Sequence, residues 1–178
     1  LLDVVEFLRA AGTVQERLVA AYQNLQTAHN AINGDEVRRI RNQRDSMEKE
    51  LRQGNNRFGE FESNTTEKSM DASEAVTRQT YRQKIVQFDT ELATATQLLP
   101  VLDQFAEGIQ RIKDARRLEN QENYNQAGKA GDEAQAIFDA IIADLESILD
   151  GEIAVSFRSI TENLLTLAHD KREVSLGF

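Results

Sequence analysis

A strip of apolar residues runs through the middle of the chain, from Tyr81 to Leu118. Its members recur at steps of three and four residues: Tyr81, Ile85, Phe88, Leu92, Ala95, Leu99, Leu102, Phe105, Ile109 and Ile112. This spacing places them along one side of an α-helix, and a sustained seven-residue repeat suits long helices packed at a shallow angle. The strip therefore predicts one long helix against which the other helices pack.

Three further stretches have the same spacing and are separated by short polar segments. The pattern predicts helices over about 1–32, 35–62, 73–126 and 132–170. Short connections make consecutive helices antiparallel. We therefore expect an all-α protein, folded as an elongated antiparallel up-down four-helix bundle that forms a single domain over residues 1–178.

Glycine and short polar residues mark the predicted turns. Gly34 suits the left-handed position at the end of a helix, and Asp35 suits the N-cap of the next one. The pattern becomes polar over 63–69, and the Asp-Ala-Ser-Glu sequence at 71–74 resembles a capping box for the third helix. Gly131 predicts the third turn in the same way as Gly34 predicts the first.

One position leaves the number of helices open. Pro100, the chain's only proline, lies near the middle of the long strip. It removes a backbone hydrogen bond and crowds the preceding turn, so the third helix is expected to be kinked or broken there. A kink keeps four helices, whereas a break makes five. Asp150-Gly151 is a second candidate for an irregularity, within the fourth helix.

Composition supports this assignment and narrows the function. The 178 residues include one proline and no tryptophan, and aromatic residues make up only 6%, which favours helix over sheet. A net charge of −9 argues against a nucleic-acid partner, because phosphates require a basic surface. The absence of cysteine excludes disulfides, thiolate catalysis and cysteine-ligated metals.

Motifs for catalysis are missing from the sequence. Its two histidines, His29 and His169, lack a metal-ligating companion at helical spacing. There is no glycine-rich phosphate loop, no nucleophile elbow and no Glu-x-x-His pair. We therefore expect no enzymatic activity, no cofactor and no metal.

Two basic clusters stand out against the acidic background. Their members are Arg38, Arg39, Arg41 and Arg44 in the second helix, and Arg111, Lys113, Arg116 and Arg117 in the third. If the turns at Gly34 and Gly131 lie at the same end of the bundle, the clusters share one axial zone and Tyr22 of the first helix faces Arg44.

Cations that converge in this way repel one another and lose solvation unless an anion or carboxylates accompany them. Guanidinium groups can hold a carboxylate through two hydrogen bonds. The clusters thus predict a site for a small organic anion, formed by Arg38, Arg41, Arg44, Arg116, Tyr22 and His29. The alternative is that the arginines are solvated and paired with neighbouring acids, namely Asp35, Glu36, Glu48, Glu119 or Glu122.

Gln15 and His29 lie on the apolar strip of the first helix, where apolar residues are expected. Two interpretations are open. They line a polar pocket, or they set the register between helices, as buried polar residues can.

Several of these features resemble one family. The amphipathic first helix, the Asn33-Gly34-Asp35 turn, the polar second turn and the turn at 130–134 are similar to those of the four-helix-bundle extracytoplasmic sensor domains. These domains belong to bacterial chemoreceptors (methyl-accepting chemotaxis proteins) and related sensor kinases, and the resemblance covers nearly the whole chain. Their usual arginines lie in the first helix, which here offers only Arg9 and Arg17, away from the distal turn. The site is therefore expected on the second and third helices.

The resemblance implies a receptor domain that projects from the bacterial inner membrane into the periplasm. It also implies flanking membrane segments outside this chain, a homodimer formed through the first helix, and a small ligand such as an organic acid or amino acid in the distal half. Because the third helix is longer than the second, a two-module bundle related to this family is a further possibility. The alternative function is a non-catalytic helical scaffold or interaction protein, whose apolar strips serve only assembly.

Overall fold

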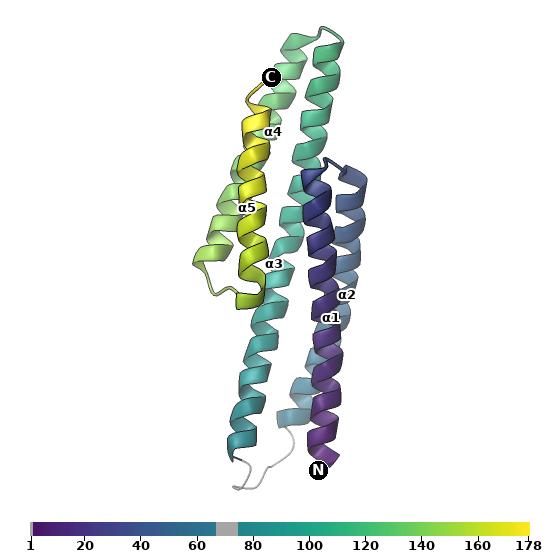
Figure 1. Ribbon diagram of the computed structural model, residues 1–178, viewed down its shortest axis with the longest axis vertical. Helices are drawn as coiled ribbons and strands as arrows, with labels where there is room; N and C mark the ends of the chain where they lie inside the picture. The colour runs from purple at the N-terminus through teal and green to yellow at the C-terminus, as the bar shows by residue number, and fades with distance from the viewer. Residues whose placement is uncertain (1, 67–74) are drawn as a thin grey trace.

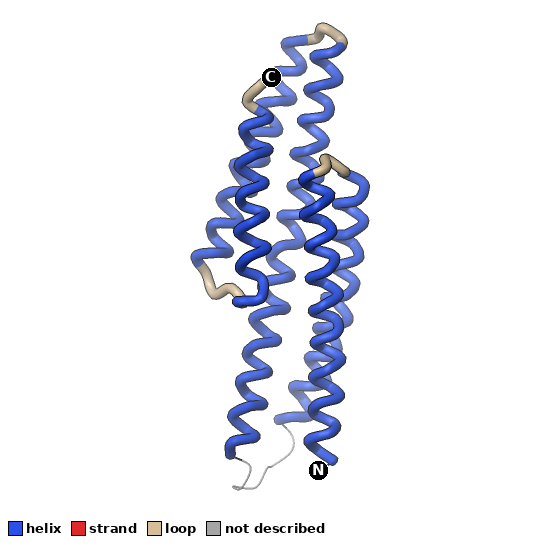
Figure 2. The backbone as a smooth tube through the Cα atoms, in the orientation of Figure 1, coloured by secondary structure: helices blue, strands red, loops and turns tan. Residues whose placement is uncertain are grey.

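The computed structural model describes residues 2–66 and 75–178, and almost all of them are helical. Five α-helices follow one another: α1 (Leu2–Asn33), α2 (Val37–Thr66), α3 (Ala75–Asn120), α4 (Tyr124–Asp150) and α5 (Val155–Ser175). The described residues contain no β-strand (Figure 2). The prediction of an all-α protein is confirmed, with five helices in place of four.

The longest helix, α3, runs along nearly the whole length of the molecule (Figure 1). α1 and α2 form an antiparallel hairpin along its first part, and α4 and α5 form a second hairpin along its last part. Where the hairpins overlap, α5 lies beside α1 and both contact α3. The architecture is thus two helical hairpins that share one long helix, rather than four helices of equal extent.

The apolar strip of α3 forms the centre of the core, as predicted. Nine of its ten predicted members are buried, and Ile85 is half-buried. Leu98, Val101 and Ala106, outside the strip, are buried as well. α3 is therefore covered on more than one side, because both hairpins pack against it. Each fully buried Phe or Leu side chain contributes about 1.5–3 kcal/mol to folding, so α3 makes a large contribution to stability.

Pro100 lies inside α3, and the helix continues through it. Its ring is exposed, so the break predicted as an alternative at this position is wrong. The fifth helix arises instead at Gly151, where α4 ends. Three residues later, the Ala154 N–H donates to Thr94 Oγ of α3 at 3.1 Å, which holds the start of α5 against the long helix.

The third turn lies earlier than predicted. It occupies residues 121–123, where Glu122 adopts a left-handed conformation with φ 60°. The predicted position at Gly131 is wrong, because this glycine is buried inside α4. A Cβ there would come within 3.0 Å of Phe178 Cβ and 3.1 Å of the Ser175 carbonyl oxygen. Gly131 therefore allows the end of the chain to pack closely on α4.

The first turn occurs where predicted, between α1 and α2, but with different backbone roles. Asp35 takes the left-handed conformation, with φ 54°, and Gly34 does not. Aspartate is among the few non-glycine residues that tolerate this conformation. The capping box predicted at 71–74, and part of the predicted second turn, lie outside the described residues.

The apolar strip predicted for the first helix is buried over most of its length. The buried residues of α1 are Ala11, Val14, Leu18, Ala21, Leu25, Ala28, Ala31 and Ile32. Near the start of α1 the pattern fails, because Val5 and Leu8 are 51% and 62% exposed. Phe7 packs on the core there instead, with its ring stacked on that of Tyr81 at 3.7 Å between centroids. No helix within the described parts of the chain combines the length and apolarity needed to cross a membrane.

Candidate functional site

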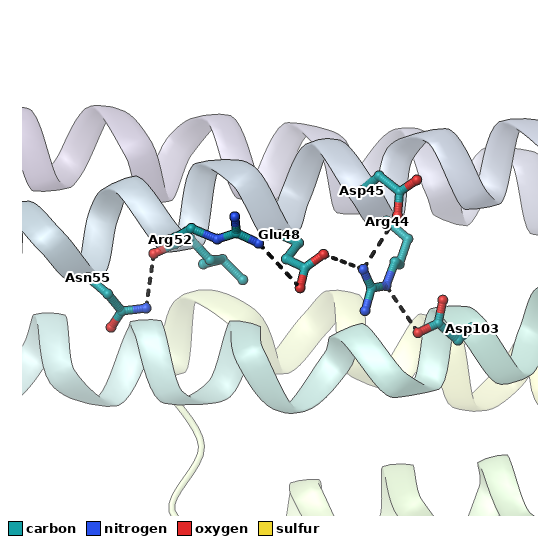
Figure 3. A network of polar contacts seen from close by, with 7 residues as sticks. Arg44, Asp45, Glu48, Arg52, Asn55 and Asp103 are labelled. Atoms are coloured by element: carbon teal, nitrogen blue, oxygen red, sulfur yellow. Dashed lines mark hydrogen bonds and ion pairs between the residues drawn. The ribbon is translucent and has the colours of Figure 1, made fainter.

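Arg44 of α2 is at the centre of a network of carboxylates (Figure 3). Its Nε donates to Asp103 Oδ2 of α3 at 3.0 Å, and its Nη1 donates to Glu48 and, at 3.4 Å, to Asp45. Its side chain is only 22% exposed. Burial lowers the pKa of Arg44, but the charges and hydrogen bonds of Asp103 and Glu48 outweigh it, so that the pKa lies above its ordinary value. The guanidinium thus links α2 to α3 and is already neutralised.

Other arginines of the two basic clusters are also paired. The pairs are Arg39 with Glu36 at 3.3 Å, Arg111 with Glu133 at 3.2 Å, Arg116 with Asp35 at 3.5 Å, and Arg117 with Asp114 at 3.4 Å. Lys171 of α5 also binds Asp35, at 2.6 Å. Three of the acids suggested by the sequence, Asp35, Glu36 and Glu48, do hold arginines. Pairing therefore accounts for much of the basic charge, although not for all of it.

Three cations remain without a partner, and they lie together. Arg38 and Arg41 of α2 and Lys113 of α3 are exposed, and none of their side chains forms an ion pair or hydrogen bond with another described residue. All three line one open groove of about 920 Å³. The full lining is Glu36, Val37, Arg38, Arg39, Arg41, Asn42, Asp45, Gln110 and Lys113. Because four cations face two carboxylates there, the groove carries a positive charge on an acidic protein.

Of the six residues predicted for the site, the structure brings Arg38 and Arg41 together in this groove. Arg44 lies next to it, since its partner Asp45 lines the groove, but its donors are taken by carboxylates. Arg116 is held by Asp35.

The two α1 residues predicted for the site lie outside the groove. Tyr22 packs its ring against Phe157 of α5, edge to face, with centroids 5.6 Å apart. His29 is half-buried on α1 and makes no hydrogen bond with a described residue. Neither lines the groove.

The predicted alignment of the two clusters depended on the position of the third turn. The pairing of Asp35 with Arg116 places the first turn level with Arg116, and the pairing of Arg44 with Asp103 places Arg44 about 20 Å further along α3 at ~1.5 Å per residue. Arg44 and Arg116 are therefore not level with each other. Lys113 is the residue that meets Arg38 and Arg41.

Sequence reasoning missed Lys113, Gln110 and Asn42 as lining residues. The sequence did contain a signal for Lys113, because this residue belongs to the basic cluster of the third helix. That cluster was expected to lie beside the basic cluster of the second helix. Gln110 and Asn42 are polar helix residues with no distinguishing pattern. Both carry amide N–H donors, which complement a carboxylate.

The groove presents unpaired cations of both helices to solvent. No group of three or more histidine or carboxylate side chains in the described ranges is arranged to hold a metal ion. Comparison with protein-family models, curated proteins and solved structures finds no match.

Proposed function

We propose that this chain is a ligand-binding sensor domain that recognises a small organic anion in the groove between α2 and α3. The observation that carries the proposal is the set of three cations without partners, Arg38, Arg41 and Lys113, in one open groove. A dicarboxylate fits such a set, because each carboxylate can accept two parallel hydrogen bonds from one guanidinium.

The wider proposal is that the domain serves a transmembrane chemoreceptor or sensor kinase on the periplasmic side of the bacterial inner membrane. It rests on the sequence resemblance described above. A ligand in the groove contacts α2 and α3 together, and α3 runs along nearly the whole molecule (Figure 1). A small displacement of α3 on binding is therefore the signal in this proposal, since it is transmitted to both hairpins.

The positions of the two ends limit how such a receptor can be built. α1 begins near one end of the long axis, and α5 ends toward the other (Figure 1). Two membrane segments attached directly at these points would lie at different levels.

A second candidate function is a helical scaffold or interaction protein. It is favoured by the exposed apolar side chains on α1, Val5, Leu8 and Val19, of which Val19 is 46% exposed. The same residues support the proposed homodimer through α1, because exposed apolar surface is stabilised by association. Sedimentation velocity measures this association directly, and a chain that stays monomeric would contradict it.

Titration with succinate and a panel of other organic acids and amino acids tests the sensor proposal. A ligand at a hundredfold excess over its Kd raises the free energy of unfolding by about 2.7 kcal/mol. The double variant Arg38→Ala/Arg41→Ala should weaken succinate binding by on the order of a hundredfold, since each guanidinium contributes about 1.5 kcal/mol or more.

The matched control is Arg82→Ala. Arg82 is an exposed arginine of α3 that also lacks a partner among the described residues but lies outside the groove. It should leave succinate affinity unchanged. If no acid in the panel shifts the melting curve, the sensor proposal fails and the scaffold function gains; if the double variant binds as well as the wild type, the groove is not the site.

A further inference from the structure

A second pocket lies between α1, α3 and α5, away from the basic groove. Its volume is about 210 Å³, and its lining is Gln15, Leu18, Val19, Tyr22, Glu91, Ser156 and Phe157. Most of this lining is apolar, and Glu91 is its only charged member. The pocket therefore combines an apolar interior with a single carboxylate.

Glu91 is buried, with 6% of its surface exposed. Its two carboxylate oxygens have different surroundings. Oε1 accepts hydrogen bonds from Gln87 Nε2 and Ser156 Oγ, each at 3.1 Å. Oε2 is buried and has no hydrogen-bond partner. No arginine, lysine or histidine among the described residues forms an ion pair with this carboxylate.

The structural role of Glu91 explains only one of these oxygens. Through Ser156, Oε1 holds the first turn of α5 against α3, beside the bond from Ala154 to Thr94. The positive end of the α5 helix dipole also favours an acidic group at this position. Neither feature satisfies Oε2, and a buried carboxylate oxygen without a donor costs free energy.

We propose that this pocket binds a small primary amine, whose ammonium group pairs with the Glu91 carboxylate while its apolar part fills the space beside Tyr22 and Phe157. An ammonium supplies the missing donor and the missing positive charge together. The faces of the Tyr22 and Phe157 rings attract a cation as well. Gln15 then lines a pocket, which is one of the two interpretations that the sequence left open for it.

The size of the pocket limits the ligand. An apolar cavity of about 150 Å³ holds a benzene molecule, so 210 Å³ is suited to a ring or short chain with one aminomethyl group. This inference does not depend on the anion groove, because the two sites share no residue.

Calorimetric titration with benzylamine tests the inference, with benzyl alcohol as the uncharged ligand of the same shape. We expect saturable binding of benzylamine and at least tenfold weaker binding of the alcohol. Glu91→Gln should weaken benzylamine binding by about tenfold or more, because it removes the charge and keeps the shape. Glu107→Gln, an exposed glutamate on the same helix, is the matched control and should bind normally.

A second variant keeps the test decisive if Glu91→Gln does not fold. Val19→Phe enlarges a partly exposed residue on the pocket wall while Glu91 stays in place. It should abolish benzylamine binding without changing the helical content measured by circular dichroism. The inference is overturned if the wild-type protein does not bind benzylamine, if benzyl alcohol binds equally well, or if folded Glu91→Gln or Val19→Phe binds benzylamine like the wild type.

Discussion

Arg44 and the pair Arg38 and Arg41 belong to the same arginine-rich start of α2, yet their surroundings differ. Arg44 is largely buried and is held by Asp103, Glu48 and Asp45 (Figure 3). Arg38 and Arg41 are exposed in the groove and have no partner among the described residues.

The helix opposite explains this difference. Where α3 presents Asp103, the α2 arginine becomes part of the helix interface; where it presents Gln110 and Lys113, the arginines remain free. An arginine with satisfied donors contributes to stability, whereas an arginine beside another cation is available to an anion. The residue across the interface thus separates a structural arginine from a binding one.

The largest effect on stability is expected at Gly108 of α3, which is part of neither the Arg44 network nor the groove. A Cβ at Gly108 would lie 2.8 Å from the Phe138 ring and 3.2 Å from Ile137. Gly108→Ala should lower the free energy of unfolding by about 1–2 kcal/mol, since overpacking a core costs more than helix propensity returns. Gly12→Ala is the control: no atom lies near its added methyl group, so it should raise stability by up to ~1 kcal/mol.

Urea denaturation measures both glycine variants, and succinate titration follows their binding. Succinate affinity should be unchanged in both, because the groove residues are untouched. A loss of affinity in Gly108→Ala would show that the groove depends on the core packing of α3. The difference between Arg44 and the groove arginines would then not be explained by the opposite residues alone.

Replacing Arg44 with alanine should separate the two roles directly. We expect a loss of about 1 kcal/mol in the free energy of unfolding, because Asp103 and Glu48 lose their common partner in a partly buried network. Succinate affinity should stay within about twofold of the wild type. A large fall in affinity with little change in stability would reverse the assignment of Arg44.

The pH dependence of the Arg44→Ala effect follows from the raised pKa of Arg44. A group whose pKa is higher in the folded state stabilises the protein fully below its unfolded-state pKa, and loses this contribution only as pH rises through the higher value. The arginine contribution should therefore be equal at about pH 7 and about pH 9. Urea denaturation of both proteins at the two pH values measures it, and a contribution lost by pH 9 would require a folded-state pKa far below the ordinary value of arginine, contrary to the raised pKa of Arg44.

A modest effect on succinate binding is expected from salt. Raising the ionic strength from about 0.01 M to about 0.15 M shortens the Debye length from about 30 Å to about 8 Å, which screens exposed charges. Succinate binding to the exposed groove should weaken roughly threefold, whereas the partly buried Arg44 network should respond less. Calorimetry at the two salt concentrations tests this, and salt-independent binding would place succinate away from the exposed arginines.

Much of the helical pattern could be predicted from the sequence, for a local reason. The strips that contain Phe88, Phe105 and Phe138 were identified from spacing alone, because the period of a helix is a property of each segment. The turn around Glu122 was missed because it contains no glycine, and Gly131 was misassigned because its small size serves packing against Phe178. The sequence alone does not show whether a glycine forms a turn or allows close packing.

The candidate site was predicted only in part. Arg38 and Arg41 were included, but so were Arg44 and Arg116, which the structure pairs with acids. The Glu91 pocket had no signal, since a glutamate between apolar residues on a helix is also found on solvated faces.

By itself, the sequence determined that the chain is all-α, that a long central helix carries the core, and that two basic clusters interrupt an acidic surface. These features depend on residues close together along the chain. Only the tertiary structure decided that Arg38, Arg41 and Lys113 share a groove while Arg44 meets Asp103. Whether a charge is paired depends on the register between helices, and a shift of one turn, about 5.4 Å, exchanges every partner.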